Sequence, residues 1–447
     1  MEQYRGFLGL AVLLAIAWAF SKQRWGIRIR TVVVALLLQF AFALLVLRWD
    51  PGRRALDWTS DRVIELIGFT TEGTAFVFGP LLSVGQEGDT IFALQVLPVI
   101  VFLGALIGLL FYLRVIQYVV HVVGGAIAWL VKTSRIESMF ASTVIFLGQS
   151  EAPLMIAPYL RSLSTAQVFT VMSSGFAAAA GSTLVGYSLL GAPLPYLLAA
   201  TVMNAPAGLL MAKIIWPDST PEPQWRERYD RTAEGSPSDT SNMKNAPKGE
   251  SRHKSNTRDN RGADDLDVRS VRDEDSANAI DAIGRGALAG GKIAVTIGAL
   301  LIAFVALIAM ANAALSGIGG WFGYDGLTFD RVLGWGFAPL AWLMGVPADE
   351  MVQAGSYIGQ KTILNEFVAY ASFGPEVPNL SSATVIIVTF ALAGFANFAS
   401  IAIQIGTISS LCPELRKTVA RLGMRALLAG SLANLANACI AGIVVAR

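Results

Sequence analysis

Long apolar stretches separated by short polar connections run through most of this chain. A helix needs about 20 mostly apolar residues to cross the hydrocarbon core of a bilayer. Eight stretches approach or exceed that length, at residues 6–20 with their flanks, 31–47, 92–112, 166–190, 196–216, 293–315, 381–406 and 426–445. The pattern predicts an all-α polytopic membrane protein with about eight transmembrane helices.

Two further apolar segments are short and interrupted. Residues 137–159 are broken by Gly148 and Pro153, and residues 349–370 are broken at Asn365-Glu366. A helix pair that enters and leaves the membrane from one face exposes unwound backbone at its tip, which is tolerated only where it lines protein or a water-filled cavity. These segments predict two re-entrant helical hairpins whose tips form a ligand site near the bilayer midplane.

A polar stretch, residues 217–277, divides the chain into two apolar halves. It is rich in Pro, Ser, Asp, Arg, Asn and Gly and has few large apolar residues, so we expect a disordered cytoplasmic loop. Each half has an interrupted segment with a Glu near its tip, followed by a long span rich in small or polar residues. This correspondence hints at an inverted repeat.

The composition agrees with a membrane protein, because 54% of the 447 residues are hydrophobic and only 15% are charged. A soluble domain carries about 25% charged residues. The net charge is +2, and the basic residues lie beside the spans rather than in one groove, which does not support nucleic-acid binding. Cys412 and Cys439 are not spaced like metal ligands, so we interpret them as free, small apolar residues and expect no metal site.

Two basic connections predict the orientation in the membrane. One follows the first span and the other lies between the last two spans; their residues are Lys22, Arg24, Arg28 and Arg30, and Arg416, Lys417, Arg421 and Arg425. The positive-inside rule places both connections in the cytoplasm, and both chain termini outside it.

The candidate chemistry centres on two carboxylates, Glu151 and Glu366, one in each interrupted segment. A charged side chain at the centre of a bilayer costs roughly 2.5 to 3.5 kcal/mol on insertion scales, so it is retained where it meets a partner, an ion or a polar substrate. The plainer alternative is that both acids lie at helix ends near lipid headgroups. Lys361 is interpreted as a salt-bridge partner or as a side chain that reaches the membrane interface.

The two acids and the polar residues around them offer amides, hydroxyls and carboxylates but no arginine. This set consists of Gln149, Ser150, Glu151, Asn365, Glu366, Asn397 and Ser400. Such a set suits a neutral, polyhydroxylated or amide-bearing solute and suits anions poorly. Asn397 and Ser400 also have a plainer interpretation, as polar contacts between helices. The residues by themselves indicate a polar neutral solute and go no further.

Three motifs resemble the substrate-site motifs of the concentrative nucleoside transporter family. They are GQSEAP at 148–153, NEFVAY at 365–370 and GFANFASI at 394–401. GTAFVFG at 73–79 and WLMGVP at 342–347 resemble the family as well. The similarity covers nearly the whole chain apart from the polar stretch.

The resemblance implies eight transmembrane helices and two re-entrant hairpins, a scaffold and a mobile transport domain in each protomer, and a homotrimer in the bacterial cytoplasmic membrane. The chain then divides into 1–115 (scaffold helices), 116–216 (interfacial helix, first hairpin and transport-domain helices), 217–277 (loop), 278–348 (scaffold and interfacial helices) and 349–447 (second hairpin and transport-domain helices).

The resemblance also implies roles for individual residues. Gln149, Ser150 and Glu151, with Phe395 beside them, would face the nucleobase; Glu366, Asn397 and Ser400 would hold the ribose; Thr183 and Asn365 would belong to the pocket wall. No cofactor is implied, and the choice between pyrimidine and purine nucleosides stays open.

The coupling ion is where the sequence departs from sodium-coupled relatives. Those carry Asn five residues before the hairpin Gln and Ser in the unwound span that follows, where this chain has Val144 and Ala178. Because sodium needs several oxygen ligands, the departure favours coupling to protons, with Glu151 as the leading protonatable residue and Glu366 as the second. Sodium coupling is the alternative, since Ser142 and Thr143 lie nearby.

The expected function is a secondary active nucleoside symporter that works by alternating access, in an elevator-like manner. A passive channel is less favoured, because broken hairpins from both faces are typical of alternating access. An intramembrane enzyme is also less favoured, since neither His121 nor His253 is placed to support paired carboxylates and no HExxH motif is present.

Overall fold

The computed structural model describes residues 2–83, 91–221, 271, 273, 276–321 and 326–445, and all regular structure in these ranges is helical. Most of the predicted loop, 217–277, lies outside the described residues. Its disorder therefore stays a prediction.

The first half of the chain ends with the first hairpin and the helices that follow it. Its elements are α1 (Glu2–Ala19), η1 (Arg24–Gly26), α2 (Ile29–Ala43) with its continuation η2 (Leu44–Arg48), α3 (Asp50–Phe78), η3 (Gly79–Ser83), α4 (Phe92–Gln95), α5 (Leu97–Tyr112), α6 (Val115–Val131), α7 (Arg135–Thr143), η4 (Ala152–Ser162), α8 (Thr165–Ala177), α9 (Gly181–Leu189) and α10 (Leu194–Ile215).

The second half begins with the longest of the described helices. Its elements are α13 (Ala279–Trp321), α14 (Phe329–Leu343), α15 (Met351–Ile363), α16 (Glu366–Phe373), η6 (Gly374–Asn379), α17 (Ser382–Leu392), α18 (Phe398–Leu411), η7 (Pro413–Leu415) and α19 (Arg416–Val445).

Six helical stretches among the described residues are long and apolar enough to cross a membrane by length and composition. They are Ile29–Arg48, Phe92–Tyr112, Thr165–Leu189, Leu194–Ile215, Ala279–Trp321 and Pro413–Val445. The remaining predicted spans correspond to shorter apolar helices, Tyr4–Ala19 at the N-terminal end and the pair Ser382–Leu392 and Phe398–Leu411. The predicted alternation of apolar spans is therefore present, with differences in length and continuity.

Two of the predicted spans are not continuous helices. The span at 166–190 is divided into α8 and α9 by residues 178–180, and the span at 381–406 is divided into α17 and α18 by residues 393–397. The two breaks lie side by side, because the backbone N–H of Phe395 donates to the carbonyl of Ala178 at 2.9 Å. Backbone freed by one break is thus satisfied by the other, as the interior of a membrane requires.

Both hairpins are present, close to the predicted positions. The first consists of α7 and the 3₁₀ helix η4, which are joined by a turn at residues 144–151 and extend slightly beyond the predicted range of 137–159. The second consists of α15 and α16, with its break at Leu364 and Asn365, one residue before the predicted break at Asn365-Glu366. α15 packs along α14, and α7 packs along α6.

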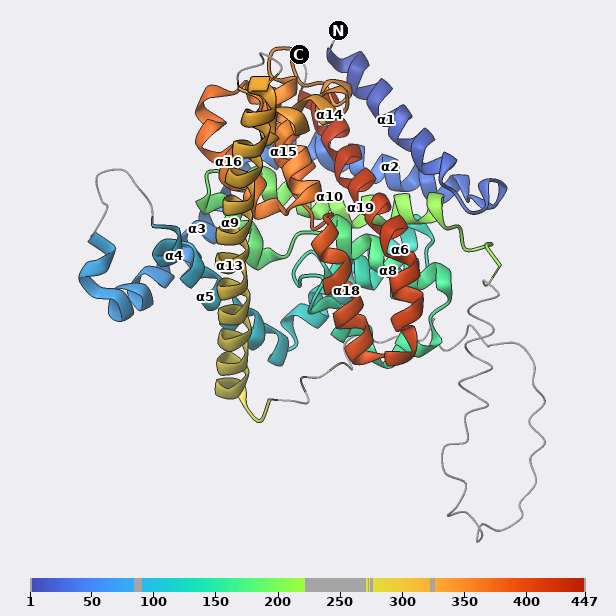
Figure 1. The fold of residues 1–447 in the computed structure, drawn as a ribbon. Helices are drawn as coiled ribbons and strands as arrows, with labels where there is room; N and C mark the ends of the chain where they lie inside the picture. Colours follow the sequence, from blue (N-terminus) through green and yellow to red (C-terminus); the bar gives the residue numbers. More distant parts are fainter. Residues whose placement is uncertain are drawn as a thin grey trace, which may run out of the picture.

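The helices α8, α10, α17 and α19 pack on one another and form the centre of the molecule. α1 packs on α19, and α2 packs on α10. α5 packs along α13, which stands to one side of the bundle (Figure 1). At their crossing a Cβ atom on Gly104 or on Gly286 would run into the backbone of the other helix, so small residues permit the close approach.

The chain ends lie at the same end of the molecule (Figure 1). The predicted division of the chain into scaffold, hairpin, loop and transport-domain parts stays a prediction.

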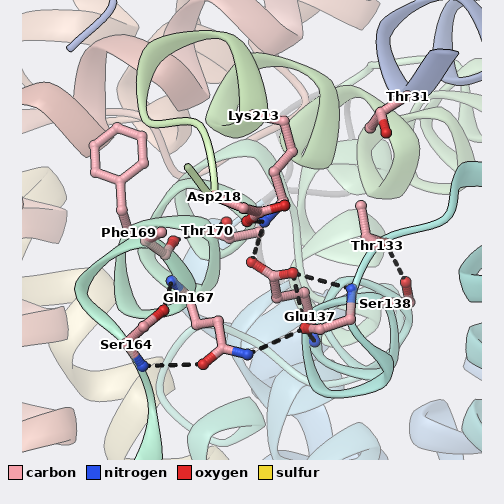
Figure 2. A network of polar contacts seen from close by, with 12 residues as sticks. Thr31, Thr133, Glu137, Ser138, Ser164, Gln167, Phe169, Thr170, Lys213 and Asp218 are labelled. Carbon is pink, nitrogen blue, oxygen red and sulfur yellow. Dashed lines mark hydrogen bonds and ion pairs between the residues drawn. The ribbon is translucent and has the colours of Figure 1, made fainter. Parts of the chain in front are cut away.

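A buried ionic network fixes the start of the first hairpin (Figure 2). Glu137 in α7 and Lys213 in the last turn of α10 form an ion pair, with side chains only 1% and 4% exposed, and Asp218 pairs with the same ammonium group. The Glu137 carboxylate also accepts from the hydroxyl of Ser134 at 2.8 Å and from the backbone N–H of Ser134 at 3.2 Å, which completes a capping box. Gln167 reaches Ser134 from a second capping box, at the start of α8. One cluster therefore joins the ends of α7, α8 and α10.

We expect Lys213→Met to destabilise the protein by about 3 to 5 kcal/mol, because Glu137 would be left as an uncompensated buried charge. Thermal unfolding of the purified protein in detergent measures the effect. The double variant Glu137→Gln/Lys213→Met is the matched control and should lose less stability than the single variant. Equal melting temperatures for wild type and Lys213→Met would contradict a structural role for the pair.

Candidate functional site

The polar site is centred on Glu366, the first residue of α16 and only 4% exposed. One carboxylate oxygen accepts from the Asn397 amide at 2.7 Å, and the other accepts from the Tyr187 hydroxyl at 3.2 Å. Asn397 lies at the break between α17 and α18, and Tyr187 lies in α9. The carboxylate thus joins the second hairpin to both broken helices. Its place in the first turn of α16 is also favourable for a negative charge, because a helix N-terminus is electropositive.

Two asparagines begin the half-helices at this point in the same way. The Asn365 side chain accepts from the backbone N–H of Val368 at 2.9 Å, and the Asn397 side chain accepts from that of Ser400, also at 2.9 Å. Both are N-caps, which satisfy backbone donors that a helix start leaves without a partner. Asn397 therefore has two functions, since its carbonyl oxygen caps α18 while its amide holds Glu366.

The tip of the first hairpin meets the same helix. Gln149 donates from its amide nitrogen to the Ser400 hydroxyl at 2.8 Å, although the two residues are 251 positions apart. Gln404, one turn further along α18, donates to the Gln149 carbonyl oxygen and to the Met172 carbonyl, each at 3.1 Å. These contacts extend the network from Tyr187 through Glu366, via the Asn397 cap on Ser400, to Gln404.

Aromatic rings lie beside the carboxylate. Tyr187 stacks on Tyr370 with ring centroids 4.4 Å apart and meets Phe367 edge-on at 4.8 Å. Phe395, predicted to lie beside the nucleobase, is buried within the second break. Thr183, a predicted wall residue in the first turn of α9, donates to the Ala180 carbonyl at 2.8 Å. The site is therefore a buried polar network with an aromatic side, which suits a ligand that has both polar and flat apolar faces.

Glu151 lies apart from this network. It lines a cavity of about 250 Å³ between the tip of the first hairpin and the helices α5 and α13. Arg285, in the first turns of α13, lines the same cavity. Ser150 is exposed. Of the predicted site residues, the structure thus brings Gln149, Glu366, Asn397 and Ser400 into one network and places Glu151 against α5 and α13.

The predicted ion-site positions are apolar and enclosed. Val144 and Ala178 are both buried, and the Ala178 carbonyl already accepts from Phe395. Ser142 and Thr143 each donate their hydroxyl to a carbonyl one turn earlier in α7, at 2.8 Å. Among the described residues, no cluster of three or more His, Cys, Asp or Glu side chains could hold a metal ion.

The entrance to the second hairpin is fixed by Glu350. Its carboxylate accepts from the Ser381 hydroxyl at 2.7 Å, from the Ser381 backbone N–H at 2.8 Å and from the Thr384 hydroxyl. Partial burial by itself would raise the pKa of Glu350, but these hydrogen bonds outweigh it and the pKa is lowered. The contact ties the beginning of α15 to the beginning of α17.

Sequence reasoning missed several members of the network. Tyr187 and Gln404 each follow a predicted site residue by four positions, Thr183 and Ser400, so helical spacing was the available signal. The interpretation of Lys361 as a side chain that reaches the membrane interface is wrong. It is 3% exposed and donates to the Ala391 carbonyl and the Asn434 side chain, because the hairpin carries it inward rather than toward the membrane surface.

Comparisons with known proteins cover nearly the whole chain. Residues 8–81 match the model described as the Na+ dependent nucleoside transporter N-terminus, residues 196–442 match that of the C-terminus, and residues 93–194 match the nucleoside recognition (Gate) model. The chain is 46% identical to the uncharacterized transporter YutK of Bacillus subtilis, covering 98% of this chain and 99% of the relative. It is 38% identical to the nucleoside permease NupC of Helicobacter pylori, covering 98% and 97%.

Solved structures agree with these matches. CNTnw in an inward-facing substrate-bound state has 42% identity and a TM-score of 0.85, covering 99% of this chain and 98% of that chain. A CNTnw variant in an outward-facing state matches with the same TM-score of 0.85. The predicted helical membrane fold is confirmed, and so is the expectation of a transport protein rather than an enzyme, since these relatives are permeases and transporters.

Asn365 and Asn397 offer a matched pair of variants. We expect Asn365→Ala to lower the free energy of unfolding by about 1 kcal/mol, as the loss of an N-cap does. Asn397→Ala should cost about 1 to 3 kcal/mol more, because it also removes a donor from the buried Glu366 carboxylate. Thermal unfolding in detergent without ligand measures both. Equal losses would show that the contact between Asn397 and Glu366 contributes nothing.

Proposed function

This chain belongs to the concentrative nucleoside transporter family, and from that premise we propose that it is a symporter that imports nucleosides across the bacterial cytoplasmic membrane with protons. The single observation that supports it most directly is the network around Glu366. It presents a carboxylate together with side-chain amides and hydroxyls in a buried site, and none of the described residues of this network is an arginine, which suits a neutral solute.

The ribose would bind to Glu366, Asn397 and Ser400. A carboxylate accepts from two vicinal hydroxyls, while an amide and a hydroxyl supply the matching donors and acceptors. In the described conformation these groups bond to one another, with Asn397 on Glu366 and Gln149 on Ser400. A nucleoside would therefore replace contacts inside the protein with contacts of the same kind, so little polar desolvation is left uncompensated.

The nucleobase would lie toward the first hairpin, near Gln149, Ser150 and Glu151, with Phe395 beside it. Gln149 both donates and accepts, so it can pair with the amide edge of a base. The buried Phe395 ring offers an apolar face for the base or the sugar. Thr183 and Asn365 complete the wall of this proposed pocket.

Proton coupling is supported by the apolar environment of Val144 and Ala178 and by the hydroxyls of Ser142 and Thr143, which bond within α7. Sodium prefers several free oxygen ligands. Glu151 would carry the proton, because it borders a cavity and protonation removes the cost of moving its charge; Glu366 is the second candidate. Sodium is the alternative, favoured by the Na+ dependent description of the matching family models.

Transport would proceed by alternating access in an elevator-like manner, within a homotrimer whose chain termini lie outside the cytoplasm. The match to CNTnw in both inward-facing and outward-facing states supports a cycle between two such conformations. The pair α5 and α13 would belong to the scaffold, since it stands to one side of the central bundle (Figure 1). The two hairpins would belong to the transport domain.

Uptake of labelled uridine into proteoliposomes tests the function and its coupling ion together. We expect accumulation with an inward proton gradient and none with an inward sodium gradient. Accumulation with the sodium gradient and none with the proton gradient would show that sodium, rather than the proton, is the coupling ion. Equilibration without accumulation would indicate a passive channel, and no uptake under either gradient would contradict nucleoside transport.

Two variants separate the proposed roles of the acids in this assay. Glu366→Gln should reduce uptake roughly 100-fold or more, since a charged hydrogen bond contributes about 1.5 to 3 kcal/mol and two are weakened. Glu151→Gln mimics the protonated form and should retain exchange of nucleoside while losing accumulation driven by protons. Glu72→Gln, at an exposed position of α3, is the control and should behave like wild type. Accumulation driven by protons in Glu151→Gln would exclude Glu151 as the proton carrier.

A further inference from the structure

Two helix C-termini point into one buried region behind the site. α8 ends at Ala177 and α17 ends at Leu392, both at breaks in the middle of the predicted spans. The last turn of a helix leaves carbonyls without partners and carries a partial negative charge of about half an electron. Both ends are buried, so the protein itself must supply donors to them.

Asparagine side chains supply some of the hydrogen-bond donors for these helix ends. Asn434 of α19, fully buried, donates to the Ala177 carbonyl at 2.7 Å and to the Ala393 carbonyl at 3.3 Å. Asn204 of α10 donates to the same Ala393 carbonyl, and its own side-chain oxygen accepts from Asn434 and from Asn437. The ends of both broken helices are therefore held by one cluster of neutral amides.

One basic side chain among the described residues joins this cluster, Lys361, which comes from the last turn of α15 in the second hairpin. Its ammonium group donates to the Ala391 carbonyl at 2.9 Å and to the Asn434 side-chain oxygen at 2.8 Å. Both acceptors are neutral oxygens, and no carboxylate of the described residues forms a direct ion pair with Lys361. The two negative helix ends provide the field that makes a buried positive charge tolerable here.

Glu366 lies five residues beyond Lys361, on the other side of the hairpin break. The Glu366 carboxylate itself is bonded to Asn397 and Tyr187. Lys361 thus holds the first arm of the hairpin to the ends of the broken helices, while Glu366 begins the second arm. Because the two arms belong to one hairpin, the position of Lys361 constrains the position of Glu366.

We propose that the Lys361 ammonium group is a tethered cation in an oxygen-lined cation site, which fixes the second hairpin to the C-termini of α8 and α17 and so positions Glu366 for the substrate. This rests on the proposed function for its link to nucleosides. The site itself does not depend on it, because its oxygens come from Ala391 and Asn434 and not from the nucleoside network. A Lys361 side chain cut back to alanine would leave these oxygens around a space that a small cation can fill.

A route for such a cation exists beside the site. A cavity of about 320 Å³, lined mainly by apolar side chains, borders both Lys361 and Ala391. A small amine can enter this space in its neutral form and become protonated next to the carbonyl oxygens. Ammonium and methylammonium are therefore suitable probes for Lys361→Ala.

The first test is thermal unfolding of the full-length Lys361→Ala protein in detergent, without nucleoside, in ammonium chloride and in choline chloride at equal concentration. We expect the variant to melt below wild type in choline and to recover part of the loss in ammonium. Lys361→Met fills the space with an apolar chain and should not recover. Lys292→Ala, an exposed position on α13, is the control and should be insensitive to the choice of salt.

The second test is uridine uptake by the same variants in proteoliposomes. Lys361→Ala should raise the KM about 10-fold or more with a smaller change in kcat, and ammonium should lower the KM again. Lys361→Gln keeps a donor without the charge and should also have a raised KM. A KM at the wild-type value in Lys361→Gln would overturn the proposal of a required cation, even if Lys361→Ala does not fold.

These outcomes separate the inference from the proposed function. Lack of ammonium-dependent stabilisation in a folded Lys361→Ala protein would overturn the cation site whether or not uridine is transported. If wild type fails to transport uridine, the proposed function fails, while recovery of stability in ammonium would still support the cation site.

Discussion

The backbone at the two helix breaks is the constraint on which the rest of the structure depends. Inside a membrane an unpaired N–H or carbonyl cannot turn to water, so every interruption of a helix needs a partner within the protein. Here the breaks are placed against each other, with Phe395 donating to the Ala178 carbonyl. Gly394 makes this approach possible, because a Cβ atom there would overlap the Ala177 carbonyl and the Asn434 side chain. The site is therefore a consequence of how the breaks are satisfied.

The same requirement explains why the polar residues are amides and hydroxyls rather than paired charges. The half-helices α16 and α18 each begin at an asparagine cap, and the C-terminal ends of α8 and α17 are met by the Asn434 and Asn204 side chains. Neutral side chains can donate and accept at once, so they can satisfy helix starts and helix ends without adding a charge that would need its own compensation. Charge is confined to a few positions, chiefly Glu366 and, behind it, Lys361.

The two acids that attract attention in the sequence differ in their surroundings. Glu366 is enclosed in a network built from both halves of the chain, and each of its oxygens accepts a hydrogen bond. Glu151 borders a cavity against α5 and α13, which lie outside the central bundle. A carboxylate that contacts a separate group of helices experiences a change of environment when the two groups shift, whereas one inside a single body does not. This difference is the physical basis for the separate roles proposed for them.

The sequence by itself determined the membrane-spanning pattern, both hairpin positions and the residues of the motifs, because apolar length, helix-breaking residues and buried polar groups are local properties of a chain. It also gave Gln149, Glu366, Asn397 and Ser400 as candidates. It did not determine that Tyr187 and Gln404 complete the network, that Glu151 lies apart from Glu366, or that Lys361 is buried beside Asn434. Each of these depends on which helices cross at the breaks. A polar residue in an apolar run has many possible partners, and only the crossing of segments up to about 250 residues apart selects one of them.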